Sequence, residues 1–253
     1  MSWLQGAVST RWLGPLAELT SSGSDDGTIG RQLSSLRPPR ENYESVGDFF
    51  DSTRGSFNLL GNATWRQPQL GAIGALLAHW SLGHDEPSVI SIPTGSGKTA
   101  VALAAPFLAT NAPTRVLVLA PSQQVRHQLT AQFSTYAQLV ALGVLPASER
   151  YPSVFEMTGR VSDWSALEEH DVVVALPNSI SPVHYPEDQQ PPPTLFDLLV
   201  VDEAHHAPAR TWSALLDYFT DVPALLLTAT PQRRDGRRIP GSLQYYYPLR
   251  RAR

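Results

Sequence analysis

The chain of 253 residues is long enough for one large domain or two small ones, and its 42% hydrophobic content is sufficient for a sizeable core. It contains no cysteine, which excludes disulfides, thiolate metal sites, iron–sulfur clusters and cysteine catalysis. Its most apolar stretch, residues 100–109, is too short to span a membrane and contains a proline, and its N-terminus lacks a secretory pattern. These features predict a soluble, cytoplasmic protein.

Charge is distributed unevenly along the chain. The net charge of −4 argues against coating nucleic acid by bulk electrostatics. Residues 232–253, however, hold seven arginines and one aspartate, a local charge of +6 against −10 for all other residues. This basic end fits contact with a phosphate backbone, and it also fits a solvated tail. Of the 19 basic residues only Lys98 is a lysine, which indicates either a site that needs a compact point charge or chance placement.

The predicted elements alternate along most of the chain. Residues 1–62 are weakly patterned and rich in turn-forming residues, and we interpret them as an N-terminal extension of unknown role. From residue 63 onward, apolar residues at helical spacing alternate with short, nearly continuous apolar runs. These patterns predict helices over 68–80, after Gly97, over 125–140, over 164–169 and after Pro208, and strands over 88–93, 115–121, 153–159, 171–176, 196–204 and 223–230.

This alternation predicts an α/β fold with a doubly wound, mostly parallel sheet. The runs of valine and leucine are typical of strands that helices cover on both faces. In such sheets, ligands bind beyond the carboxyl ends of the strands. The proline-rich segment 186–193 is predicted to be a surface loop.

The segment PTGSGKTA, residues 93–100, follows the first predicted strand and opens a helix. Glycines at two of its positions let backbone N–H groups turn inward around a phosphate at the helix N-terminus. Lys98 is then predicted to reach β- and γ-phosphates, and Thr99 to offer its hydroxyl to Mg²⁺. Ile92 occupies the first glycine position of the strict P-loop pattern, and a glycine-rich turn without a ligand is the alternative. The candidate nucleotide-binding residues are Thr94, Gly95, Ser96, Gly97, Lys98 and Thr99.

A second candidate cluster ends the fifth predicted strand, in the segment VVDEAHHA, residues 200–207. An aspartate beside a P-loop can hold the Mg²⁺ that bridges two phosphates, which gives Asp202 a metal-binding role. Glu203 is predicted to polarise the attacking water as a general base. His205 is predicted to link the phosphate site to neighbouring strands by hydrogen bonds, since adjacent histidines rarely ligate one metal together. A solvated turn is the alternative for the acidic pair.

These motifs together resemble a known family. PTGSGKT, DEAH and TAT, in this order on successive strands, resemble motifs I, II and III of superfamily 2 helicases and translocases. The wider strings VDEAHHA and LTATPQRRDG resemble the DEAD/DEAH-box branch that contains type III restriction-enzyme subunits. The resemblance covers about residues 63–240 and implies a RecA-like P-loop NTPase lobe with ATP and Mg²⁺ as ligands. It implies catalytic roles for Lys98, Asp202 and Glu203.

Weaker correspondences follow from the same resemblance. WRQPQLGA resembles the adenine-reading segment, with Gln69 on the base and Arg66 assisting, although Pro68 stands where an aromatic residue is common. Thr228 and Thr230, with His205, resemble the element that couples the ATP state to the grip on nucleic acid. Other loops resemble backbone-contacting motifs, and ordinary loop residues are the alternative. The candidate nucleic-acid contacts are Pro121, Ser122, Gln124, Thr158, Gly159, Pro177, Asn178 and Ser179.

The resemblance also implies a second RecA-like lobe that completes the ATP site with an arginine finger. We expect that lobe in the same full-length chain, with a partner chain as the alternative source, and we interpret residues 241–253 as the start of a linker towards it. The predicted function is the ATP-binding and ATP-hydrolysing lobe of a DNA helicase or translocase. An RNA helicase lobe and a non-catalytic nucleotide-binding or scaffold module are the alternatives.

Overall fold

A single parallel sheet forms the centre of the protein. The computed structural model describes residues 48–59, 64–84, 86–148, 150–204, 209–231 and 239–248. Within them the sheet has seven strands in the order β3-β4-β2-β5-β6-β1-β7, and all neighbours run parallel. This confirms the predicted fold class. The strands are β1 (Ser88–Ser91), β2 (Val116–Leu119), β3 (Val154–Met157), β4 (Val172–Ala175), β5 (Leu198–Val201), β6 (Ala224–Thr228) and β7 (Ser242–Tyr246).

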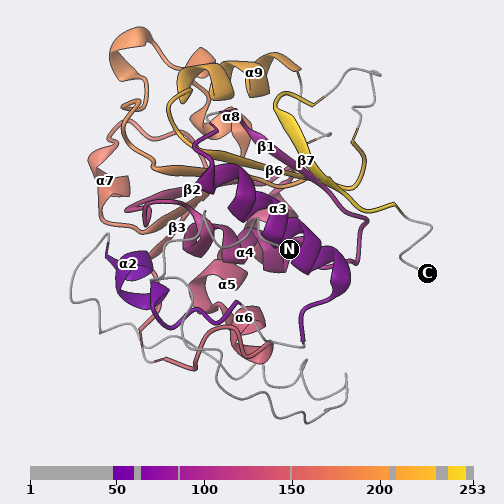
Figure 1. The fold of residues 1–253 in the computed structure, drawn as a ribbon. Coiled ribbons are helices and arrows are strands. Elements are labelled where there is room, and N and C mark those ends of the chain that lie inside the picture. Colours follow the sequence, from indigo (N-terminus) through magenta and orange to yellow (C-terminus); the bar gives the residue numbers. More distant parts are fainter. Residues whose placement is uncertain are drawn as a thin grey trace.

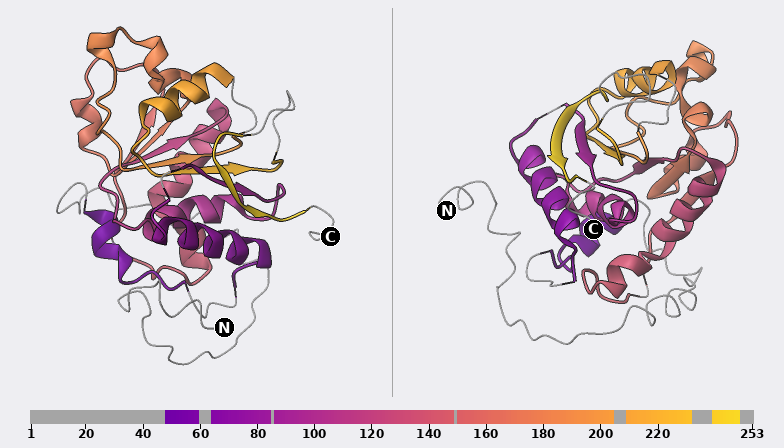
Figure 2. Two further views of the ribbon diagram at one scale, coloured as in Figure 1. Left: turned by 45° about the horizontal axis from the view of Figure 1, so that its top comes forward. Right: turned by 90° about the vertical axis from the view of Figure 1, so that its right-hand side faces the viewer.

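Helices cover both faces of the sheet (Figures 1 and 2). One face packs against α2 (Phe49–Arg54), α3 (Gln67–Ser81), α4 (Lys98–Leu108), α5 (Gln123–Thr135) and α6 (Ala137–Ala141). The other packs against α7 (Ser165–Glu168), α8 (Pro177–Ile180) and α9 (Ala209–Tyr218). Two short 3₁₀ helices, η1 (Pro182–His184) and η2 (Glu187–Gln189), lie between α8 and β5 in the chain. No helix of the described residues is long and apolar enough to cross a bilayer.

The apolar strand runs divide between two cores. Successive side chains of a strand point to opposite faces, so one strand serves both helix layers. In β2, Val116 and Val118 join the core beneath α2–α6, whereas Leu117 and Leu119 join the core beneath α7–α9. The inner strands are buried along their whole length, while the edge strands β3 and β7 are only partly buried. Nearly continuous apolar runs therefore mark the inner strands.

The predicted helix over 125–140 is wrong as a single element. Tyr136 adopts a left-handed conformation with φ 48°, which ends α5 at Thr135 and lets α6 begin at Ala137. Its ring is 2% exposed and packs edge-on against Phe107 and Phe133. The break between α5 and α6 therefore coincides with the burial of this large ring. The spacing of apolar residues alone did not predict the break.

The sheet also extends beyond the expected end of the lobe. Residues 241–253 were expected to start a linker, but β7 lies within them and pairs in parallel with β1. Its sequence SLQYY mixes polar and apolar residues because an edge strand is only partly covered. At the other end, Phe49 and Phe50 of α2 lie in the expected N-terminal extension and are buried in the core. Residues 1–47 and 249–253 lie outside the described residues.

Candidate functional site

The strand order brings the predicted phosphate-site residues to one edge of the sheet. The P-loop follows β1, and Asp202 and Glu203 follow β5. Only β6 lies between these two strands, and Thr228 is its last residue. Since the strands are parallel, their carboxyl ends lie at the same edge (Figure 1). Three segments far apart in the sequence therefore meet at the position where α/β folds bind ligands.

The P-loop has a backbone that only glycine adopts readily. Gly95 and Gly97 have φ of 81° and 90°, and Gly97 is the N-cap of the 11-residue helix α4. The Ser96 N–H donates to the Pro93 carbonyl at 3.2 Å, which closes the turn. Apart from Gly95 itself and its two neighbours in the chain, no described atom lies within 4 Å of the place that a Cβ on Gly95 would occupy. Open space before a helix N-terminus fits the phosphates of a nucleotide.

Arg66 and Gln69 hold the P-loop from the start of α3. The Gln69 side chain is buried, accepts from the Arg66 N–H at 2.8 Å and donates to the Gly97 carbonyl at 3.3 Å. The Arg66 guanidinium donates to the Gly95 carbonyl at 3.0 Å. A Cβ on Gly97 would lie 2.0 Å from Gln69 Nε2, so glycine is required here for close approach as well as for φ. These contacts join the predicted adenine-reading residues to the phosphate loop.

Lys98 and Glu203 form an ion pair across the site, with side chains 9% and 20% exposed. The turn after β5 is fixed by its neighbours, because the Asp202 N–H donates to Leu119 of β2 and the Ala204 N–H to Leu227 of β6, both at 2.9 Å. Glu203 itself has a left-handed backbone with φ 49°, unusual for a residue with a side chain. Strain of this kind clusters at functional sites.

Asp202 is the predicted cation ligand of the site. Burial, together with the neighbouring Glu203, raises the pKa of its carboxyl from 3.8 to about 6, against the opposing effect of Lys98. A divalent cation would relieve this cost of burying a carboxylate. Among the described residues no group of three or more acidic or histidine side chains could hold a metal alone.

The end of β6 lies between the P-loop and the acidic pair Asp202 and Glu203. The Thr228 hydroxyl donates to the Thr230 carbonyl at 2.7 Å, and the Thr230 N–H donates back to that hydroxyl at 3.2 Å. The Thr228 carbonyl also accepts from the N–H of Ile92, just before the P-loop, at 3.0 Å. Thr228, one of the predicted coupling residues, thus contacts the segment that leads into the P-loop. His205 lies outside the described residues.

The predicted nucleic-acid contacts collect on the other half of the same edge. They follow β2, β3 and β4, which are neighbours in the sheet. Thr158, Gly159, Gln124 and Asn178 are exposed, whereas Ser179 is buried. Ser122 is the N-cap of α5, where its hydroxyl accepts from the Val125 N–H at 3.3 Å. The structure therefore separates a candidate nucleotide half from a candidate nucleic-acid half.

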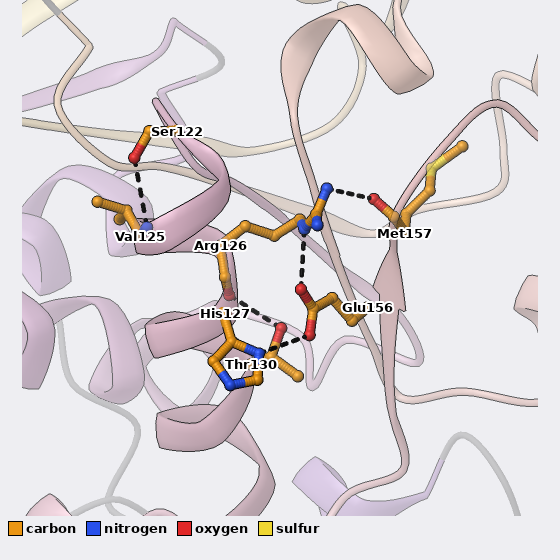
Figure 3. A network of polar contacts seen from close by, with 7 residues as sticks. All are labelled: Ser122, Val125, Arg126, His127, Thr130, Glu156 and Met157. Carbon is orange, nitrogen blue, oxygen red and sulfur yellow. Dashed lines mark hydrogen bonds and ion pairs between the residues drawn. The ribbon is translucent and has the colours of Figure 1, made fainter.

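One polar cluster was missed by sequence reasoning. From α5, Arg126 and His127 reach the Glu156 carboxylate of β3, at 2.9 and 3.2 Å (Figure 3). Arg126 also donates to the Met157 carbonyl at 3.2 Å. A signal was present in the sequence, since Arg126 lies one helical turn before the buried Leu129, on the face that packs inward.

The fold and the site define the class: this is a RecA-like P-loop lobe. Residues 62–233 match the family model "Type III restriction enzyme, res subunit", and the chain belongs to this family. It is 27% identical over 148 residues to the "51.5 kDa protein" of Lactococcus phage (isolate 7-9), a match that covers 58% of this chain and 25% of that protein.

Two solved structures of UvsW from bacteriophage T4 are similar in fold. One is 15% identical with a TM-score of 0.50, covering 81% of this chain and 40% of the other. The second, titled a helicase, is 14% identical with a TM-score of 0.49, covering 87% and 67%. This chain therefore spans a quarter of the length of its curated relative and less than half of the first UvsW chain.

Proposed function

We propose that this chain is the ATP-binding and ATP-hydrolysing lobe of a DNA helicase or translocase. In the complete protein it would couple the hydrolysis of ATP to ADP and phosphate with movement along nucleic acid. The observation that carries this proposal is the contact between Lys98 of the P-loop and Glu203 after β5, next to the desolvated Asp202. This arrangement supports roles for Lys98 as the phosphate-binding cation, for Asp202 as the metal-binding carboxylate and for Glu203 as the general base.

Each residue has a separate role in the proposed reaction. Lys98 and the backbone N–H groups of residues 94–97 bind the phosphates of ATP, and Thr99 and Asp202 hold Mg²⁺. When bound, Mg²⁺ supplies positive charge that offsets the charge on the phosphates. As ATP enters, Lys98 exchanges the Glu203 carboxylate for phosphate oxygen. Glu203 is then free to orient a water molecule and accept its proton.

The proposed partner is the backbone of DNA. The candidate contacts are short polar side chains and backbone groups, which suit phosphate oxygens and do not read bases. They lie on the strands next to the nucleotide half of the sheet, so a change at one half can reach the other through β2 and β5. The family's name, a restriction-enzyme subunit, favours DNA over RNA.

We further propose that a second RecA-like lobe completes the ATP site, from the same full-length chain or a partner chain. The chain's coverage of 40% of a UvsW chain supports this, because the lobe described here corresponds to part of that longer protein. The second lobe would supply an arginine to the γ-phosphate.

Two substitutions test the ATP site. Lys98→Ala is expected to abolish Mg·ATP binding, whereas Glu203→Gln is expected to keep binding and prevent hydrolysis, because the glutamate acts on the water. Lys98→Arg is expected to fail as well, since a planar guanidinium does not replace a compact ammonium. Fluorescent-nucleotide titration and phosphate release measure the two steps. Equal ATP affinity in wild type and Lys98→Ala would contradict the assignment.

The alternatives are separated by the nucleic acid that stimulates turnover. Phosphate release by the wild type is measured with no nucleic acid, with single-stranded DNA and with single-stranded RNA of the same sequence. Stimulation by DNA alone supports the proposal, and stimulation by RNA alone would favour an RNA helicase lobe. ATP binding without hydrolysis, even with a second lobe supplied, would favour a non-catalytic nucleotide-binding module.

A further inference from the structure

The end of β3 is the least supported strand end in the candidate nucleic-acid half. β3 is an edge strand and pairs only with β4. Its first end is held by the Asp171 carboxylate, which accepts from the Ser153 N–H at 2.7 Å. Its other end leads directly into Thr158 and Gly159, which are both exposed. This end is also held by contacts from α5.

Arg126 provides that attachment with two groups of one guanidinium. Nε donates to the Glu156 carboxylate at 2.9 Å, and Nη1 donates to the Met157 carbonyl at 3.2 Å (Figure 3). The residue is 7% exposed, so a charged group has been buried here. The pKa of Glu156 lies below its ordinary value, because the hydrogen bonds from Arg126 and His127 outweigh the burial that would raise it. The Glu156 carboxyl is therefore ionised at neutral pH.

Packing alone does not require an ion pair with a buried arginine at this position. Apolar side chains of similar volume often replace such pairs without loss of stability, because desolvation costs about as much as the attraction gains. An apolar side chain lacks the planar guanidinium group, whose several N–H donors can bind a carboxylate and a backbone carbonyl at the same time; we call this group the fork. The fork ties Met157, the residue before Thr158, to the helix that begins after Ser122.

We propose that Arg126 is a positioning residue that holds residues 121–122 and 158–159 at a fixed spacing, as one surface for the phosphate backbone of a single strand. This inference rests on the proposed function, since it concerns the same nucleic-acid interface. Arg126 acts through the segments it holds and does not itself contact the strand. The ATP residues follow β1, β5 and β6, so loss of the tie leaves the nucleotide half in place.

The test compares Arg126→Met and Arg126→Lys with wild type in the full chain. The probe is a fluorescein-labelled oligothymidylate, titrated at two salt concentrations, and Mg·ATP affinity is measured in parallel. Both variants are expected to bind the oligonucleotide about three- to tenfold more weakly, the loss of one well-placed contact, with unchanged ATP affinity. Arg126→Lys keeps the charge and loses the fork, so a purely electrostatic role predicts that it binds as wild type does.

Arg115 is a matched control, because it lies at the amino-terminal ends of the strands, away from the candidate site. Its guanidinium donates to the backbone carbonyls of Glu168, His170 and Leu195, at 2.8, 3.1 and 2.9 Å. Arg115→Met is expected to lower thermal stability without changing oligonucleotide affinity of the folded protein. If Arg126→Met does not fold, Glu156→Gln is the deciding variant, because it keeps the shape of the side chain and weakens its contact with Arg126. It is expected to reduce affinity about threefold.

The outcomes separate the inference from the function it rests on. If wild type binds the oligonucleotide and the folded Arg126 and Glu156 variants bind it equally well, the positioning role is overturned and the proposed function stands. If wild type shows no binding while Mg·ATP binds, the nucleic-acid part of the proposed function is overturned. Weaker ATP binding in the Arg126 variants would also contradict the inference, because it would indicate a general structural role.

Discussion

Asp202 is the residue at which pH should act on ligand binding. Burial first, and then Glu203, raise the pKa of its carboxyl to about 6. Cation binding needs the ionised carboxylate, so Mg·ATP affinity is expected to fall as the pH drops from 7.5 to 5.5. Calorimetric titration at several pH values, with and without Mg²⁺, measures this. Asp202→Asn should bind weakly with little pH dependence, and an unchanged pH profile in that variant would contradict the assignment.

The same pKa predicts a cost in stability. A carboxyl whose pKa rises on folding binds its proton more tightly in the native state, so its contribution to stability is lost as pH rises from 3.8 to about 6. Above this range the ionised Asp202 costs up to about 3 kcal/mol. Asp202→Asn is therefore expected to be more stable than wild type at pH 7.5 but not at pH 4. Urea unfolding at both pH values tests this, and equal differences would contradict it.

Tyr136 places a hydroxyl in the core without a partner. Its Oη has no hydrogen-bond partner among the described residues, and burial raises the pKa of its phenol well above the ordinary value. Tyr136→Phe is expected to stabilise the protein by about 1 kcal/mol, because it removes a buried, unsatisfied group. Tyr185→Phe is the matched control: its hydroxyl donates to the Ser179 carbonyl, so this change should destabilise. Thermal unfolding of both variants measures the difference in sign.

At the scale of elements, helix α3 and strand β7 approach each other at one glycine. A Cβ on Gly71 would lie 2.3 Å from the ring of Tyr245, which packs on the core, whereas a Cβ on Gly74 would meet nothing within 4 Å. Gly74→Ala is expected to stabilise α3 by about 0.5–1 kcal/mol through helix propensity. Gly71→Ala should be less stable than Gly74→Ala by about 1 kcal/mol or more, because the ring must move. Equal stabilities of the two variants in chemical unfolding would show that the Tyr245 ring moves aside at no cost.

The strands of the sheet divide into two groups by the candidate residues that follow them. β1, β6 and β5 end in the candidate nucleotide residues, and β2, β4 and β3 end in the candidate nucleic-acid residues. β2 and β5 are direct neighbours, and the N–H of Asp202 donates to Leu119 at the end of β2. That contact joins the two halves directly.

For the whole molecule, we expect slow turnover of ATP by this chain alone. The proposed second lobe closes on the γ-phosphate, and without it the transition state lacks an arginine. Hydrolysis by the purified chain should therefore lie well below the typical range of about 1–10³ per second for enzymes. Steady-state phosphate release over a range of protein concentrations measures it. Rapid turnover that is independent of concentration would mean that an arginine of this chain completes the site.

We also expect binding to single-stranded DNA to be weak, indifferent to sequence and strongly dependent on salt. The chain outside residues 232–253 carries −10, so attraction must come from the basic end. The slope of log affinity against log salt should be near −0.7 for each phosphate neutralised. Titration of two unrelated labelled strands measures it, and salt-insensitive or sequence-selective binding would contradict the prediction.

A truncation isolates the contribution of the last arginines. Because β7 belongs to the sheet, the deletion must begin at residue 249, which removes Arg250, Arg251 and Arg253 and leaves the strand intact. The salt slope of the shortened chain should be flatter. An unchanged slope would assign the attraction to other residues.

The candidate chemical groups of this protein are predictions from its sequence. The P-loop, Asp202 and Glu203 are predicted as site residues because each motif needs particular residue types at fixed spacing, next to one strand. The inner strands were predicted for a similar reason, since burial on both faces demands an unbroken apolar run. The predicted motifs also allowed the family to be inferred, and the match over residues 62–233 confirms it.

Only the tertiary structure decided which of these elements are neighbours. The strand order, the membership of β7 and the break at Tyr136 depend on contacts between distant segments, and local spacing does not encode them. The tie from Arg126 to Glu156 joins residues 30 positions apart through an edge strand and a helix. The sequence by itself thus determined the chemical groups and the class of fold, because both follow from local pattern. Packing decided how those groups face one another, because that depends on the whole chain at once.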